Sequence, residues 1–213
     1  MKDLYRKIGT LLVLLLPLAF VGRGGYGQWA TGYVYLFLIQ GYVAWFLFFK
    51  TNQPFFGYSV TMALGAYGTA VLTVVFHWPL ALAMVASCGI SAAIAMLLFL
   101  CTSRARGFYL SMISFLLAIM FPMLVEALTP ITGGRSGIYF RGLRDVWSRD
   151  SLFLLVVGLT VLVVGSLFWI MGTKTGKIFT LLAENDDLAK AVGIDTFRYK
   201  LLAYGIAGLF SGL

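Results

Sequence analysis

Long apolar runs separated by short polar segments dominate this chain. The five middle runs each hold about 20 residues, enough at about 1.5 Å per residue to cross a hydrocarbon core of about 30 Å. The pattern predicts an all-α fold: a polytopic transmembrane helix bundle of six spans plus an incomplete seventh. The runs are Ile8–Val21, Trp29–Phe49, Phe55–Phe76, Pro79–Leu100, Phe108–Leu128, Leu152–Gly172 and Leu201–Leu213.

The first run is shorter than the others and follows Lys2, Arg6 and Lys7. A cleaved signal peptide and a retained anchor both fit this arrangement, and the missing small-x-small pattern before Arg23 favours the anchor. No separate soluble domain, Pro- or Ser-rich linker or short repeat interrupts the chain. Residues 1–213 are therefore expected to form a single transmembrane domain.

The cations lie between the apolar runs, as the cost of about 2.5–3.5 kcal/mol for a charge at mid-helix requires. If the spans alternate from a cytoplasmic N-terminus, eleven cations lie inside: Lys2, Arg6, Lys7, Lys50, Arg104, Arg106, Lys174, Lys177, Lys190, Arg198 and Lys200. Five lie outside: Arg23, Arg135, Arg141, Arg144 and Arg149. The excess of cations on the inner side, eleven against five, predicts the orientation of a multi-pass protein of the cell membrane, inner or plasma. Residues 173–200 are expected inside and residues 129–150 outside.

Composition excludes an ordinary soluble domain. Hydrophobic residues make up 61% of the chain and charged residues 11%, far from the roughly half and one quarter of soluble proteins. The net charge of +8 is dispersed among short loops rather than gathered on one face, so no nucleic-acid partner is expected. Membrane lipid is the expected surrounding.

No constellation for catalysis or metal binding is found in the sequence. Cys88 and Cys101 lie about 20 Å apart on one predicted span, beyond disulfide reach, and are interpreted as packing thiols. His77, the only histidine, precedes Pro79 in a tight outer turn without a second metal-binding residue nearby. No Gly-x-x-x-x-Gly-Lys element is present. We therefore expect no enzyme activity, no metal and no cofactor in this chain itself.

The fifth span contains a weakly polar stripe of residues three or four positions apart: Ser111, Ser114, Ala118, Pro122 and Glu126. Glu126 is the only ionisable residue within a predicted span, and such an acid is by default a candidate for a functional site. It also lies about one turn from the outer boundary. A role on a solute path and a role as an interfacial or helix-pairing acid both remain open.

The segment 173–200 is a polar, mixed-charge stretch between two apolar runs. Asn185 is a favoured N-cap, acidic residues follow it, and Gly193 is typical just past a helix end, which predicts a short helix over Asp186–Val192. Its apolar edge consists of Leu188, Ala191 and Val192, and its polar surround of Glu184, Asp186, Asp187 and Lys190. So small an apolar area predicts docking in a groove of another protein.

This segment resembles the coupling segment of permease subunits of branched-chain amino-acid ABC importers, of the LivM type. The matching residues are Gly176, Glu184, Ala189, Ala191, Gly193, Ile194, Arg198, Tyr199 and Lys200. Two further segments are similar to the family: Gly57–Tyr67, with the sequence GYSVTMALGAY, and the outer loop Thr132–Gly137, with the sequence TGGRSG. The resemblance covers roughly residues 53–213.

The resemblance implies a permease that forms the pathway for a small solute and is driven by separate ATPase subunits, which bind the ATP. It implies a second related permease and an external solute-binding protein as partners. The implied ATPase-coupling residues are Glu184, Asn185, Asp186, Asp187, Leu188, Ala189, Lys190, Ala191, Val192 and Gly193. The expected pathway residues are Gln53, Gly57, Tyr58, Gly65, Tyr67, Ser111, Ser114 and Glu126, with Gly133, Gly134 and Gly137 in the external loop.

The chain departs from the family pattern ahead of Gly57. Gln53 is kept, but Phe49, Asn52 and Phe55 occupy positions that are usually flexible or polar, and Tyr58 stands where His is usual. Aromatic side chains at the edge of the pathway favour an apolar or aromatic solute over a highly polar one, and the resemblance implies branched-chain or other apolar amino acids. Ala183 also replaces a family Arg before the coupling helix.

The last run could cover only about 20 Å of a core of about 30 Å. Related permeases continue for several more spans, so a fragment or a truncated reading frame is expected, unable to transport alone. Gly208 and Gly212 form a small-x-x-x-small face whose neighbouring helix is expected to be missing. The alternative function is a secondary transporter or passive solute channel that uses Glu126 and needs no ATPase.

Overall fold

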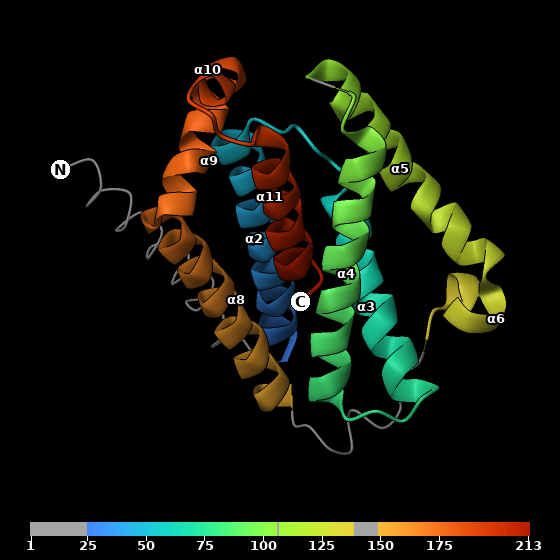
Figure 1. Cartoon of the computed structure of the whole chain (residues 1–213). Coiled ribbons are helices and arrows are strands. Elements are labelled where there is room, and N and C mark those ends of the chain that lie inside the picture. The colour runs from blue at the N-terminus through green and yellow to red at the C-terminus, as the bar shows by residue number, and fades with distance from the viewer. Residues whose placement is uncertain (1–24, 106, 139–148) are drawn as a thin grey trace.

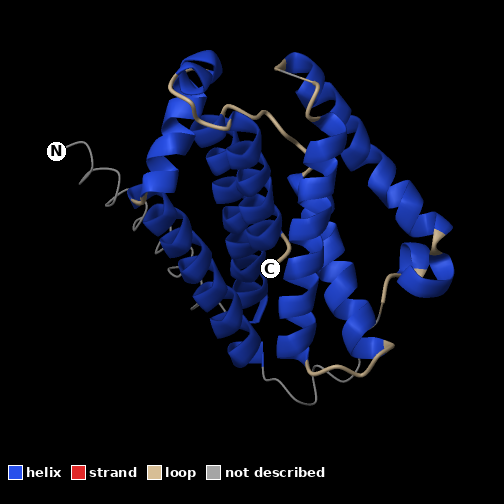
Figure 2. Cartoon of the chain, in the orientation of Figure 1, coloured by secondary structure: helices blue, strands red, loops and turns tan. Residues whose placement is uncertain are grey.

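Helices account for most of the residues that the structure describes (Figures 1 and 2). The structure, a computed structural model, describes residues 25–105, 107–138 and 149–213, and these residues contain no strand. The elements are α2 (Gly25–Thr51), α3 (Tyr58–Val74), α4 (Leu80–Thr102), α5 (Phe108–Ala127), α6 (Thr129–Thr132), η2 (Gly134–Ser136), α8 (Arg149–Gly172), α9 (Lys174–Glu184), α10 (Asp186–Ala191) and α11 (Thr196–Ser211).

Four of these helices, α2, α4, α5 and α8, are long and apolar enough to cross a membrane. Their mean hydropathy is high and most of their surface is exposed apolar side chain, as expected where lipid rather than water surrounds a helix. Burial is lowest in α5, at 17% of its membrane-length window against 33% in α2. The predicted first span and the predicted cytoplasmic N-terminus lie outside the described residues.

The third predicted span is shorter than expected. α3 starts at Tyr58, not at Phe55, and holds 17 residues. Pro54 disfavours a helical conformation at the preceding residue, and Asn52 has a positive φ of 50°. The chain therefore leaves α2 through a non-helical segment, residues 52–57.

α11 lies at the centre of the bundle, where it packs against α4, α2, α3 and α9, and its end lies at mid-height (Figure 1). The expected absence of a neighbour for Gly208 and Gly212 is wrong. A Cβ atom at Gly208 would strike Ala95 and the backbone of α4, and one at Gly212 would strike Ser91. The small residues thus serve close packing of α11 on α4.

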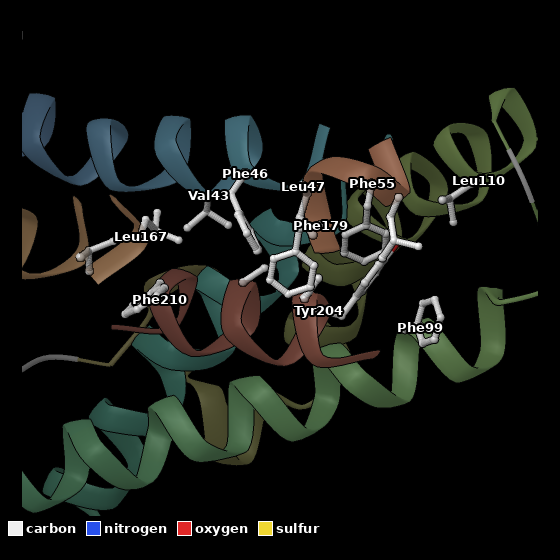
Figure 3. Packing of buried hydrophobic residues seen from close by; sticks show 14 of the residues in the cluster. Val43, Phe46, Leu47, Phe55, Phe99, Leu110, Leu167, Phe179, Tyr204 and Phe210 are labelled. Carbon is white, nitrogen blue, oxygen red and sulfur yellow. The ribbon is translucent and has the colours of Figure 1, made fainter. Parts of the chain in front are cut away.

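Aromatic side chains fill the centre of the core (Figure 3). The ring of Tyr204 on α11 lies 4.8 Å from that of Phe55 and 4.9 Å from that of Phe99, measured between centroids. Phe46 on α2 meets Phe179 on α9 at 5.4 Å with the rings nearly perpendicular, a favoured arrangement. These contacts join the membrane helices to the segment that follows α8.

Candidate functional site

The segment that precedes the predicted coupling helix is itself helical. α9 begins at Lys174, where the hydroxyl of Thr173 accepts a hydrogen bond from the Gly176 N–H. Phe179 and Leu182, three positions apart, are fully buried against the bundle. Residues 173–200 are polar and mixed in charge, a pattern that did not predict the helix α9. The i, i+3 spacing of Phe179 and Leu182 was a usable signal for that helix.

The short helix predicted over Asp186–Val192 is confirmed as α10, which ends one residue earlier than expected. The side chain of Asn185 accepts hydrogen bonds from the N–H groups of Asp187 and Leu188, both at 3.0 Å. At the other end Gly193 has a φ of 83°, a left-handed conformation that glycine adopts without steric cost. α10 is therefore a single short helix bounded by a cap on each side.

The side chains of α10 divide between two directions. Ala189 is completely buried against the rest of the chain. The predicted apolar edge, Leu188, Ala191 and Val192, is exposed, with Leu188 at 52% and Val192 at 70%. The three apolar side chains of Leu188, Ala191 and Val192 therefore point outward, while Ala189 packs the inner side of the helix against the rest of the chain.

Ion pairs surround this helix. Lys190 lies 3.2 Å from Asp187, and Arg198 lies 2.8 Å from Asp195. The side chain of Lys200, on α11, lies 2.7 Å from the Oδ2 atom of Asp186 at the start of α10. Glu184 and Asp187 face outward and are exposed, so the outer surface combines an apolar edge with charged side chains.

A buried polar cluster lies near the end of α11 and was not predicted. The amide of Gln40 on α2 donates to the Ser211 carbonyl at 3.1 Å, and the Ser211 hydroxyl contacts the Gln40 Oε1 atom at 2.9 Å. That hydroxyl also lies 3.0 Å from the hydroxyl of Thr61 and 2.7 Å from the carbonyl oxygen of Tyr58. The Ser91 hydroxyl donates to the Thr61 carbonyl at 3.1 Å. The signal was available, since Gln40 is a single amide within an apolar run.

A cavity of about 300 Å³ opens beside this cluster. Apolar and small side chains dominate its lining, with Gln40, Thr69 and Ser211 as polar exceptions. The lining residues are Leu36, Ile39, Gln40, Met62, Gly65, Ala66, Thr69, Ala70, Leu80, Met84, Ser211, Gly212 and Leu213. An apolar cavity with a few polar groups is the usual form of a small-molecule site.

The structure brings only some of the predicted pathway residues to this region. Gly65 lines the cavity, and a Cβ atom there would strike the backbone of Gly212. Tyr58 contributes its backbone carbonyl to the polar cluster. Tyr67 lies on the same helix, partly buried, and is not a cavity residue.

Three of the remaining predicted pathway residues, Ser114, Gly57 and Gln53, lie in or against the segment 52–57, whereas the Ser111 hydroxyl bonds to Gly107 rather than to this segment. Ser114 on α5 is buried and its hydroxyl accepts a hydrogen bond from the Phe56 N–H at 3.0 Å. Gly57 leaves room for the ring of Phe55, which a Cβ atom would strike. The amide of Gln53 donates to the Asn52 carbonyl at 3.2 Å, and the Ser111 hydroxyl lies 3.4 Å from the Gly107 carbonyl oxygen.

Glu126 lies near the end of α5 and contacts the loop Thr132–Gly137, which the sequence predicts to be external. Its carboxylate pairs with Arg135 at 2.8 Å, and the two side chains are 48% and 86% exposed. Gly133, Gly134 and Gly137 have φ values of 71°, 55° and 67°, which favour glycine at all three positions of the TGGRSG loop. Such a contact is of the kind expected for an interfacial acid, and Glu126 is not among the cavity residues.

The four apolar helices of membrane length indicate an integral membrane protein. The chain belongs to the family of permease components of branched-chain amino acid transport systems, which it matches over residues 31–213. It is thus a transmembrane transport protein of an amino-acid transport family. Comparison with curated proteins and with solved structures gave no significant match.

Proposed function

We propose that this chain is the LivM-type membrane permease subunit of an ATP-binding-cassette importer and forms the pathway for branched-chain or other apolar amino acids. Separate ATPase subunits bind and hydrolyse the ATP, a second related permease completes the pathway, and an external binding protein delivers the solute. The observation that supports this proposal is the outward apolar edge of α10, made of Leu188, Ala191 and Val192.

The chemistry of α10 favours a protein groove as its binding partner. A helix of six residues is too short to be stable alone, so it depends on contacts on both sides. Its inner side already packs through Ala189. Its outer side carries Asp187, whose side chain is 85% exposed, and the negative surface of a cytoplasmic leaflet would repel that carboxylate. An ATPase groove that receives the apolar edge satisfies both conditions.

The cavity beside Gln40 fits the proposed class of solute. Its lining is largely apolar, as a branched aliphatic side chain requires, and Gln40 supplies a polar group beside it. Small-molecule sites are typically apolar with a few polar groups that fix the orientation of the ligand. We therefore add Gln40 and Ser211 to Gly65 as proposed pathway residues.

The docking of α10 is tested by placing a charge on its exposed edge. Leu188→Glu should abolish co-purification of an ATPase that contains Walker motifs, because a carboxylate in an apolar groove is costly. The matched control is Ile131→Glu, which changes an equally exposed residue on α6 (57% against 52%) and should leave co-purification intact. An ATPase that binds both variants equally would contradict the proposal.

The proposed orientation has its own test. In a chain without Cys88 and Cys101, Lys190→Cys should react with a membrane-impermeant maleimide in inside-out vesicles and be protected in intact cells. Arg135→Cys, on the external loop, should react in the opposite way. Labelling of position 190 from outside intact cells would place α10 where no ATPase can reach it.

A further inference from the structure

The ion pair between Asp186 and Lys200 differs from the other ion pairs around α10. It joins two helices, α10 and α11, across 14 residues of sequence with an Nζ–Oδ2 distance of 2.7 Å. Its side chains are only 26% and 16% exposed. The neighbouring pairs Lys190–Asp187 and Arg198–Asp195 are local, three residues apart, and involve side chains of up to 85% exposure. Only the first of these pairs can transmit displacement between elements.

We propose that Asp186 and Lys200 are positioning residues for transport: their ion pair makes α10 and α11 move as one rigid unit, so that a displacement of α10 reaches the centre of the bundle. The inference rests on the proposed function, in which an ATPase displaces α10. The displacement would pass from α10 to α11 through the contact between the Lys200 Nζ and Asp186 Oδ2 atoms.

The backbone on either side of α10 cannot supply this rigidity alone. Asn185 is extended, with φ −158° and ψ 109°, which breaks the helix between α9 and α10. Gly193, with a φ of 83°, breaks it again before α11. Between two such breaks a helix with one fully buried side chain, Ala189, can pivot unless a side chain fixes it.

The carboxylate of Asp186 depends strongly on Lys200. Its Oδ1 atom is buried and has no hydrogen-bond partner in the structure. Its Oδ2 atom has Lys200 at 2.7 Å and Lys190 only at 3.9 Å. A largely buried charge whose main partner is removed is destabilised far more than an exposed one, so loss of Lys200 should release Asp186 from its position.

From Lys200, α11 extends to the polar cluster and the cavity. A helix of 16 residues is about 24 Å long. Its far end contacts three other helices: Gly208 packs on α4, and Ser211 bonds to Gln40 on α2 and to Thr61 on α3. A shift of Lys200 along the axis of α11 would therefore displace the side of the cavity that Ser211 and Gly212 form.

The test uses the complex of this chain with its co-purifying ATPase and partner permease, reconstituted in proteoliposomes with the solute-binding protein. Uptake of radiolabelled leucine, isoleucine, valine and phenylalanine is measured together with ATP hydrolysis. Asp186→Asn and Lys200→Met should lower the solute transported per ATP roughly tenfold, within the usual range of coupling between two sites. Lys200→Met changes a residue on α11 outside the proposed ATPase-binding surface, so ATPase binding should be retained in that variant. Arg198→Gln is the matched control, since it removes an exposed pair, and should leave the ratio unchanged.

The charge-swapped chain, Asp186→Lys with Lys200→Asp, distinguishes loss of the ion pair from general damage to the fold. It should restore at least part of the lost ratio, which a purely structural loss would not predict. An unchanged ratio in both single variants overturns the inference, as does a swapped chain that assembles fully but remains as uncoupled as either single variant. A wild-type complex without ATPase, or without ATP-dependent uptake of any of the four amino acids, instead defeats the proposed function.

Discussion

Gln40 and Ser211, 171 residues apart in sequence, exchange two hydrogen bonds in the interior of the bundle. The carboxamide of Gln40 uses its NH₂ group on the Ser211 carbonyl and its oxygen on the Ser211 hydroxyl. Gln40 is 8% exposed and Ser211 3%. Since no water competes in such surroundings, the amide and the hydroxyl satisfy each other's hydrogen-bonding groups within the apolar bundle.

Gln40→Leu should destabilise the protein by about 1–2 kcal/mol, because the carbonyl of Ser211 loses its buried donor. The measurement is the temperature at which half of the purified protein loses its monodisperse elution. Gln28→Leu is the control, since Gln28 lies on the same helix and bonds to Asp150 at an exposed position. Equal shifts for the two variants would show that burial of the amide is unimportant.

Gly65→Ala should cost about 1–3 kcal/mol of stability, because its Cβ atom would strike the backbone of Gly212 and force α3 and α11 apart. Gly89→Ala on α4 adds the same methyl group where nothing lies within 4 Å, and should be neutral or slightly stabilising. Thermal unfolding of both variants in lipid nanodiscs compares them directly. A neutral Gly65→Ala would mean that the two helices are not in contact in the protein.

Asn185→Ala should destabilise α10 by about 0.5–2 kcal/mol, because two N–H groups lose their acceptor. Faster hydrogen exchange should be confined to the amides of residues 186–192. Asn185→Asp keeps an acceptor at the same place and should exchange like the wild type. Unaltered exchange in the alanine variant would exclude a capping role.

Tyr204→Phe should leave stability unchanged or raise it. The hydroxyl of Tyr204 is buried without a hydrogen-bond partner, and an unsatisfied buried polar group costs about 1–3 kcal/mol. The ring contacts with Phe55 and Phe99 are kept in the variant. A clear loss of thermal stability would show that the hydroxyl has a partner in the protein.

Glu126→Gln should change stability by less than about 0.5 kcal/mol, because the pair with Arg135 is solvent-exposed and such pairs contribute little. Transport should persist under the proposed ATP-driven mechanism. Under the alternative of a secondary transporter the same substitution would abolish proton-coupled uptake. Uptake driven by a pH gradient, measured with and without ATP, separates the two.

The apolar runs predicted most of the membrane helices because length and hydrophobicity are local properties. α4 and α5 begin or end within two residues of the expected spans. The helix α10 was also predictable, since Asn185 and Gly193 mark its ends through local backbone chemistry. The later start of α3 had a local signal in Pro54, whereas the contact of Phe55 with Tyr204, 149 residues away in the chain, had none.

The candidate site was only partly predictable for the same reason. Gly65 could be chosen from a local motif, but the cavity around it exists only because α11 places Gly212 beside it. Ser111, Ser114 and Glu126 on α5 stay a prediction as pathway residues, and the stripe did not reveal that Ser114 bonds to the backbone of Phe56. Spacing along one helix shows which side chains share a face but not which neighbour that face meets.

The weak burial of α5 has a practical consequence for biochemical work on this protein. Among its described residues only Leu110, Ser114 and Val125 are buried, so few contacts within this chain hold the helix. Harsh detergent should detach it first and, through Ser114, release the segment 52–57. Mild extraction with native lipid retained is therefore the condition under which solute binding should be sought.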